Sequence, residues 1–497
     1  MLGDNEKLAK VQAQRGAKLN GSDESFIERD ENWVLKECRG WLQEHYSDYR
    51  NLGPERKKEA IKESISNYVM TKKPLVRGYN DDDGNLDATK LIAYLVNEIT
   101  DYGILADAMR DEDVFEIRIN GKEIKVEKKG KVQDLVDNEG NIVSFESVEQ
   151  QETIFRKLMG DVRLTPKDAV VNARTIEGYR VAAVHSSATS SDPQRPNDPM
   201  YHSMVLRKFK TSKMDLSQIV AFNTLSDNMA RLLSLLPAGG LTFVTVGPTA
   251  SGKTTTNNAI LQAVPSTTRT VLLQNPSEID LRFKDPSGRV FNDVLHLEAR
   301  EIDNPRPSDP TMENLMAHIL RLSPTFVCFG ELRTNKEFKL GMQIAQAGHP
   351  INCTYHAESS EGAIRRFLTA YLAESGNEPS HLALDMLTSL VNLVIVQKIM
   401  RDGRRRIIQI SEVVGVDPAN PNKPLINDLY LYETIGEPEY DESGKVVKIN
   451  GRHKRVGKLS DRTIRKFRLE GVKTSEYDFL CKDVDPNEIE TYTGKLK

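Results

Sequence analysis

Apolar residues recur along this chain with two different periods, and these periods predict which segments are helices and which are strands. Between residues 32 and 68 an apolar residue returns every three to four positions, as in a helix with one buried face. The same spacing predicts helices at 88–104, 148–159 and 223–236. Apolar and polar residues alternate, as in half-buried strands, at 114–120, 124–127, 178–184 and 204–209.

These elements predict that the first part of the chain holds two regions. Residues 1–80 are predicted to form a polar terminus followed by a helical module. Residues 81–213 combine helices with a small sheet, which is typical of an α+β domain.

The pattern changes at about residue 214, where buried strands and helices begin to alternate. Predicted strands lie at 241–246, 271–273, 326–329, 353–355 and 390–399. This alternation predicts an α/β domain with a parallel sheet over residues 214–435. An Asp402-Gly403 turn predicts that the last of these strands returns as a hairpin into 406–410. Residues 436–497 are charged and are predicted to form a C-terminal extension.

Composition adds limits to this picture. A length of 497 residues fits about three domains, and the formal net charge of −4 gives no field that favours nucleic acid. The four cysteines lie far apart, which is typical of reduced thiols in the cytoplasm. No apolar run is long enough to span a bilayer, so we expect membrane association only by peripheral docking.

The strand at 241–246 leads into Gly247, Pro248, Thr249, Ala250, Ser251, Gly252, Lys253 and Thr254, a complete G-x-x-x-x-G-K-[ST] motif. The glycines allow a tight turn whose N–H groups point at phosphate oxygens, and the next helix presents its positive end to the same anion. Lys253 supplies a charge for the β- and γ-phosphates, and the Thr254 hydroxyl can ligate Mg²⁺. We therefore predict that these residues, with Thr255, bind a nucleoside triphosphate and Mg²⁺.

Polar residues at the ends of other predicted strands are candidates for the chemistry. Glu331 follows the strand 326–329, where it could polarise water or help hold Mg²⁺. His349 and His356 flank the strand 353–355 and are candidates for sensing the γ-phosphate or orienting Glu331. Glu278 follows the strand 271–273 and is a further candidate.

The ordered motifs resemble those of the secretion-superfamily ATPases of type II and type IV secretion and pili, and most closely the CpaF-type ATPases of Tad/Flp pili. The resemblance covers about residues 91–434. It rests on Gly330-Glu331-Leu332-Arg333 as a Walker B segment, on Gly348-His349 to His356-Ala357 as a His box, and on motifs at 102–121, 172–181, 206–209 and 396–415.

This resemblance implies a fold and a mode of action. The fold would be α/β, with a P-loop, RecA-like ATPase domain after an α+β domain and an N-terminal helical module. The chain would form a homohexameric ring in the cytoplasm and dock on inner-membrane platform proteins, with ATP held between its two main domains. It would drive pilus assembly or protein secretion. Phosphate or inter-subunit contacts would come from Arg174, Arg180, Arg207, Arg300 and Arg321.

The chain departs from the family in its acidic box, which typically reads I-E-D-x-x-E. Here Gln274 and Asn275 replace two carboxylates, and Glu278 remains. Because an amide cannot accept a proton from water, a second hypothesis is a nucleotide-binding structural or regulatory subunit with little turnover. A third is a motor for conjugative DNA transfer, for which the basic clusters at 401–406 and 452–455 could be cited, although both are predicted to be solvated turns.

Overall fold

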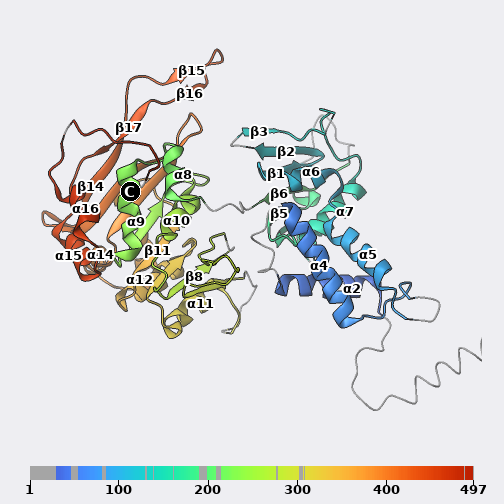
Figure 1. The fold of residues 1–497 in the computed structure, drawn as a ribbon. Coiled ribbons are helices and arrows are strands. Elements are labelled where there is room, and N and C mark those ends of the chain that lie inside the picture. The colour runs from blue at the N-terminus through green and yellow to red at the C-terminus, as the bar shows by residue number, and fades with distance from the viewer. Residues whose placement is uncertain are drawn as a thin grey trace, which may run out of the picture. The chain divides into compact units, whose positions relative to one another are not determined.

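The computed structural model describes residues 29–45, 54–80, 85–128, 131–137, 139–160, 162–189, 199–208, 214–275, 278–300, 306, 308–485 and 487–495. The chain divides into two compact units, unit 1 (Met1–Thr211) and unit 2 (Ser212–Lys497) (Figure 1). Along the stretches that the structure describes, no helix is both long enough and apolar enough to cross a membrane.

Unit 1 begins with three helices that share one apolar cluster. They are α2 (Glu31–Glu44), α4 (Pro54–Lys72) and α5 (Ala88–Thr100). Their inward residues include Leu42, Ile65 and Leu95, each of which is fully buried. An amphipathic helix gains stability by burying its apolar stripe, and here each helix covers the stripes of the other two. The helical cluster therefore extends beyond residue 80 and includes α5.

The rest of unit 1 is an antiparallel sheet of six strands in the order β3-β2-β1-β6-β5-β4. The strands are β1 (Val114–Asn120), β2 (Glu123–Lys128), β3 (Lys131–Asp134), β4 (Val170–Arg174), β5 (Arg180–Val184) and β6 (Ser203–Arg207). The helical segments are η2 (Gly103–Leu105), α6 (Ala106–Arg110), α7 (Val148–Met159) and η3 (Ser186–Ala188). Alternate strand residues pack with α7 in one core, which confirms the predicted alternation.

Unit 2 is built on a sheet of nine strands in the order β17-β14-β13-β12-β7-β11-β10-β8-β9. The strands are β7 (Phe243–Val246), β8 (Thr270–Gln274), β9 (Val294–Glu298), β10 (Phe326–Phe329), β11 (Ile351–Tyr355), β12 (Leu393–Ile399), β13 (Arg405–Asp417), β14 (Asn420–Thr434) and β17 (Gly451–Arg455). From β12 to β9 all neighbours pair in parallel, and β13, β14 and β17 add antiparallel strands. The predicted α/β class is confirmed.

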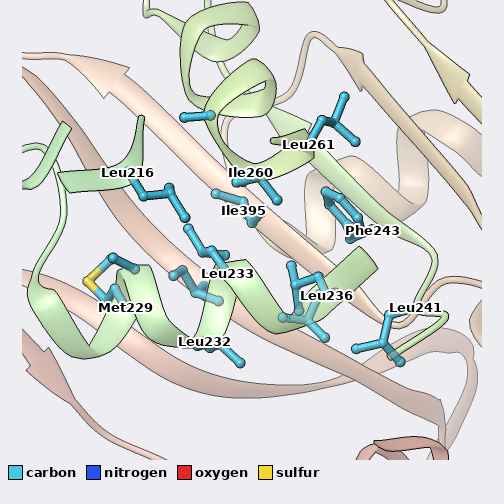
Figure 2. Close-up of a cluster of buried hydrophobic side chains, with 14 of the residues drawn as sticks. Leu216, Met229, Leu232, Leu233, Leu236, Leu241, Phe243, Ile260, Leu261 and Ile395 are labelled. Carbon is cyan, nitrogen blue, oxygen red and sulfur yellow. The ribbon is translucent and has the colours of Figure 1, made fainter. Parts of the chain in front are cut away.

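Helices cover both faces of this sheet. One face packs against α8 (Leu216–Ala221), α9 (Asp227–Ala238), α10 (Lys253–Leu261), α15 (Asp461–Leu469) and α16 (Thr474–Cys481). The other packs against α11 (Met312–His318), η4 (Ile319–Leu322), α12 (Asn335–Gln346), α13 (Ser360–Ser375) and α14 (Ser380–Leu390). Figure 2 shows the first core, where Leu233 and Leu236 of α9 lie beside Phe243 and Ile260. This packing fixes the helix that follows β7.

The region after residue 436 is part of unit 2 rather than a charged extension. A small hairpin of β15 (Glu439–Tyr440) and β16 (Val446–Lys448) precedes β17, which pairs with β14. Phe467 of α15 and Tyr477 of α16 are fully buried in the core. The expectation that 452–455 is a solvated turn is wrong, because His453 and Arg455 are buried in β17. The high charge of α15 hides one strongly apolar stripe.

Residues 490–494 fold back over the start of α9, and we call them the C-terminal clasp. The carboxylate of Asp227 accepts hydrogen bonds from Thr491, Thr493 and Gly494 at 2.6–3.0 Å. Tyr492 contacts His453 of β17 through its hydroxyl at 2.9 Å. The clasp thus joins the beginning of unit 2 to the last strand of its sheet.

Candidate active site

Five adjacent parallel strands of unit 2 end at the same edge of the sheet, and the candidate site lies there. At this edge β12 leads to Gln397, β7 to Gly247 and β11 to His356. The next two strands, β10 and β8, lead to Glu331 and Asn275. Ligands of parallel α/β sheets bind at the carboxyl ends of the strands. The topology therefore brings residues together that are up to 150 positions apart in the sequence.

The P-loop (residues 247–254) turns from β7 into α10 through unusual backbone angles. Gly252 has φ +91° and is the N-cap of α10, and Ala250 has φ +61°. The left-handed region suits glycine, whereas alanine pays a steric cost there. Gly247 is needed for another reason, because a Cβ at this position would lie 1.9 Å from the carbonyl oxygen of Gln397. Both glycines of the motif are thus required by geometry.

Lys253 lies inside the loop, as the first residue of α10. Its Nζ donates to the carbonyl oxygens of Gly247 and Pro248, both at 2.9 Å, and its side chain is buried. The ammonium group therefore stands on the concave side of the turn, at the positive end of the helix. Thr254 and Thr255 follow in the first turn of α10, whose N–H groups have no acceptors within the helix. This arrangement suits an anion with several oxygens.

A buried amide cluster holds α10 against the strands. Asn257 of α10 and Asn352 of β11 exchange hydrogen bonds of 2.8 and 2.9 Å, and Asn257 also bonds Thr245 of β7 at 3.3 Å. All three are fully buried, where unpaired amides would be costly. The cluster fixes the helix end that faces the loop, and the sequence motif does not include it.

His356 connects the P-loop to Glu331. Its Nδ1 lies 3.0 Å from the carbonyl oxygen of Gly247, and its Nε2 lies 3.3 Å from Oε1 of Glu331. Both neighbours are hydrogen-bond acceptors, so the ring satisfies both only when each nitrogen carries a proton or the carboxyl group carries one. One ring thus spans from the turn that receives phosphate to the candidate catalytic carboxylate.

Glu331 is also fixed from its other side. Its Oε2 accepts a hydrogen bond from Nε of Arg333 at 2.9 Å, and Arg333 donates to the carbonyl oxygen of Asn275 at 3.3 Å. The Glu331 side chain is 27% exposed, so one part of it remains open to solvent or ligand. Contacts from Arg333 on one side and His356 on the other fix the direction of this carboxylate.

Two of the predicted residues lie at the opposite edge of the sheet. His349 precedes β11, whereas His356 follows it, and a strand of five residues separates the two by about 17 Å. Arg321 lies in η4, ahead of β10. In this chain neither residue shares the site with Glu331, which corrects the expectation that both histidines would act on it. Residues that precede a strand of a parallel sheet lie at one edge of the sheet, and residues that follow it lie at the other edge.

Gln274 has a structural role in the altered acidic box. Its Oε1 accepts the N–H groups of Glu278 at 3.0 Å and Ile279 at 2.7 Å, and its Nε2 donates to the carbonyl oxygen of Ile279 at 2.9 Å. The side chain is buried. A carboxylate could accept the first two bonds but could not donate the third. The amide therefore fits this turn, and the partly buried Glu278 follows it.

The remaining predicted arginines fall in different places. Arg300 is exposed and follows β9, at the same edge of the sheet as the P-loop. Arg174, Arg180 and Arg207 lie in unit 1 and form a row across β4, β5 and β6, because Arg174 pairs with Arg180 and Arg180 with Arg207. On its other side Arg207 lies opposite Glu116 of β1, and opposite charges across a pair of strands are favourable. The row therefore combines three arginines with an acidic neighbour.

Sequence reasoning missed two residues that contact the P-loop from the β12–β13 hairpin. Arg405 donates from Nε to the carbonyl oxygen of Ala250 at 3.1 Å. Gln397, at the carboxyl end of β12, approaches Gly247 and Gly252. In the sequence, the one indication of this role is that the two residues lie on either side of the turn of a hairpin whose first strand neighbours β7.

The two cysteines next to the site, Cys328 and Cys353, are inert, because burial raises the pKa of both thiols far above its usual value.

The edge has the parts that a magnesium–nucleotide complex requires. The turn excludes a Cβ at Gly247, and it brings an ammonium group and the start of a helix together. Such an arrangement is suited to phosphate oxygens. The hydroxyl of Thr254 and the carboxylate of Glu331 are oxygen donors of the type that Mg²⁺ prefers. When bound, Mg²⁺ would neutralise charge on the phosphates, and the carboxylate would orient water.

Comparison with known proteins gives a family match. Residues 115–424 match the family described as type II/IV secretion system protein. An uncharacterized protein of Methanocaldococcus jannaschii is 27% identical over 248 residues, which cover 50% of this chain and 40% of that protein. The type II secretion system ATPase E of Vibrio cholerae is 28% identical over 282 residues, which cover 56% and 49%. The chain thus spans about half the length of these relatives or less.

Solved structures align over a similar part of the chain. The ATPase DotB of Legionella pneumophila aligns with a TM-score of 0.45 and 20% identity, over 64% of this chain and 83% of that chain. The pilus retraction motor PilT aligns with a TM-score of 0.44 and 15% identity, over 64% and 84%.

Proposed function

Because the chain belongs to the type II/IV secretion system protein family, we propose that it is an ATPase whose turnover powers pilus assembly or protein secretion. The observation that carries the proposal is the continuous contact from Lys253 through the carbonyl of Gly247 and the ring of His356 to Glu331. It supports the proposal because the P-loop and a carboxylate lie at one edge of one sheet, an arrangement that would suit ATP hydrolysis.

Each residue has a proposed role. Lys253 and the P-loop amides bind the β- and γ-phosphates, and Thr254 ligates Mg²⁺. Glu331 orients the attacking water. His356 contacts both the P-loop and Glu331, so it links the binding of phosphate in the loop to the position of Glu331. Glu278 adds negative charge near the same edge.

The arginine row of unit 1 is proposed to complete the site in an assembly. Its three guanidinium groups, on Arg174, Arg180 and Arg207, would bind phosphate oxygens bidentately, as planar arginine forks do. We propose a homohexameric ring of the Tad/Flp pilus type, in the cytoplasm and docked on an inner-membrane platform. Relative movement of the two units would transmit the energy of turnover. Light scattering with and without ATP tests the ring.

The activity has a direct test on the full chain. Lys253→Ala is expected to abolish binding of a fluorescent ATP analogue. Glu331→Gln should keep that binding but lower steady-state phosphate release about 100-fold or more. Phosphate release that survives both substitutions would refute the site.

One observation favours a second candidate, a nucleotide-binding subunit with little turnover. Gln274 is committed to three hydrogen bonds with the turn at 278–279, so this position supplies no carboxylate. Tight ATP binding without phosphate release, even with membrane partners present, would support this candidate. Of the basic clusters cited for a DNA-transfer role, Arg406 and Arg455 are buried and only part of each cluster, such as Arg401 and Arg452, is exposed.

A further inference from the structure

The β12–β13 hairpin contacts the P-loop at its beginning, middle and end. The carbonyl oxygen of Gln397 lies against Gly247, as described above. A Cβ on Gly252 would lie 2.9 Å from Cδ of Arg405 and 3.0 Å from Nε2 of Gln397. Between these points, Nε of Arg405 donates to the carbonyl oxygen of Ala250. Two residues of the hairpin thus contact three residues of the loop.

Ala250 is the position where the loop most needs an external bond. Its φ of +61° is uncommon for a residue with a Cβ, and such conformations persist when the surroundings hold them. Inside the loop the carbonyls of Gly247 and Pro248 are held by Lys253, but the carbonyl of Ala250 is held by Arg405. The hairpin therefore supplies the bond that fixes the peptide after Ala250.

Two buried polar atoms mark the same contact. In the described part of the chain, Oγ of Ser251 and Oε1 of Gln397 have no hydrogen-bond partner, although both residues are buried. Buried polar atoms without partners are rare in native structures, so the two atoms are an unusual feature of this contact. Both lie where the hairpin meets the loop, so the two elements share a contact that includes polar side chains as well as backbone.

We propose that Arg405 is a positioning residue, which sets the P-loop conformation through the carbonyl of Ala250 and so couples nucleotide binding to the β12–β13 hairpin. The inference rests on the proposed function, because it requires that the P-loop binds nucleotide. Arg405 acts through its Nε–H group rather than through its charge. Lysine has a methylene group at the position of Nε, so Arg405→Lys keeps the charge and moves the nearest donor one atom further along a flexible side chain.

The test compares Arg405→Lys, Arg405→Ala and the control Arg401→Ala in the full chain. Arg401 is exposed in the turn of the same hairpin. Both Arg405 variants are expected to weaken binding of a fluorescent ATP analogue by a similar factor of about 3- to 10-fold, as for the loss of one hydrogen bond. Their kcat should change less than about 2-fold, and hydrogen exchange of the amides at 247–254 should become faster. Arg401→Ala should match the wild type.

Several results would overturn the inference. Affinity that Lys preserves and Ala loses would mean that the positive charge, and not the Nε–H group in particular, carries the effect. A fall in kcat at unchanged affinity would place Arg405 in turnover, and unchanged affinity and exchange in both variants would remove its role. Lys253→Ala, measured in parallel, separates these failures from failure of the proposed function. If Lys253→Ala also leaves binding intact, the nucleotide site itself is wrong.

Discussion

His356 and Glu331 meet across 3.3 Å at the ends of the neighbouring strands β11 and β10. The same ring also reaches the P-loop at Gly247, so the contact relates phosphate binding to the carboxylate. Removing the ring should affect turnover more than binding, because Lys253 and the loop amides remain.

We predict that His356→Asn lowers kcat for phosphate release about 10- to 100-fold and changes nucleotide affinity less than about 3-fold. Single-turnover phosphate release and equilibrium binding give the two values. His349→Asn is the matched control, because His349 lies at the other end of the same strand. Equal losses in the two variants would contradict the assignment.

Gly247→Ala should abolish nucleotide binding, because its Cβ would overlap the carbonyl oxygen of Gln397 and displace the loop or the hairpin. Thermal unfolding should show a loss of about 1–3 kcal/mol in stability. Gly348→Ala controls for backbone conformation, since Gly348 also has positive φ but a Cβ there meets nothing within 4 Å. A fully active Gly247→Ala protein would show that the approach of Gln397 is unimportant.

Gln274→Glu restores the carboxylate that the acidic box of the family has at this position. We nevertheless predict that it lowers the stability of the folded protein. The carbonyl oxygen of Ile279 would lose its donor and face a carboxylate in a buried turn. The free energy of unfolding should fall by about 1–3 kcal/mol, without a gain in turnover. Denaturant titration measures the loss, and Gln343→Glu, on the exposed face of α12, should be nearly neutral. A rise in kcat would instead support a missing catalytic acid.

Stability should decrease at mildly acidic pH because of His453. Burial lowers the pKa of His453 to about 4, from 6.5 in an exposed histidine. As the pH falls from about 6.5 to about 4, His453 is protonated in the unfolded chain but stays neutral in the folded chain. The free energy of unfolding therefore decreases. This one group contributes about 3 kcal/mol across that window. His453→Gln should flatten the decline in urea unfolding measured at pH 7, 6 and 5. Parallel curves for the two proteins would contradict this account.

Local patterns in the sequence were sufficient for elements with a regular apolar period, whereas α11 to α14 and the long strand β14 were not predicted individually. The predicted helix at 148–159 and the strand at 326–329 match α7 and β10 at both ends, because their apolar periods are regular. By contrast, β9 was missed, since its five residues are only half-buried at the sheet edge and include His296. The helices after residue 460 were missed because charge dominates their composition.

The sequence predicted the residues of the P-loop and, from their places after predicted strands, Glu331 and His356, but not the contacts among them. The P-loop residues are contiguous, so their shared role follows from the sequence. The contacts of His356 with Gly247, and of Arg405 with Ala250, depend on which strands are neighbours, and strand order is a property of the whole sheet. His349 was predicted to act with Glu331 because it is close to a strand in the sequence. It lies before that strand, however, and so at the edge of the sheet opposite to Glu331.

The C-terminal clasp has a mechanical consequence. The segment from unit 1 enters unit 2 ahead of Leu216, and Gly494 of the clasp lies directly against the carbonyl oxygen of Ser217. Separating this segment from the rest of unit 2 therefore requires that the hydrogen bonds at Asp227 and at Tyr492 break as well. Residues close to the end of the chain thus hold the first two helices of unit 2 in place.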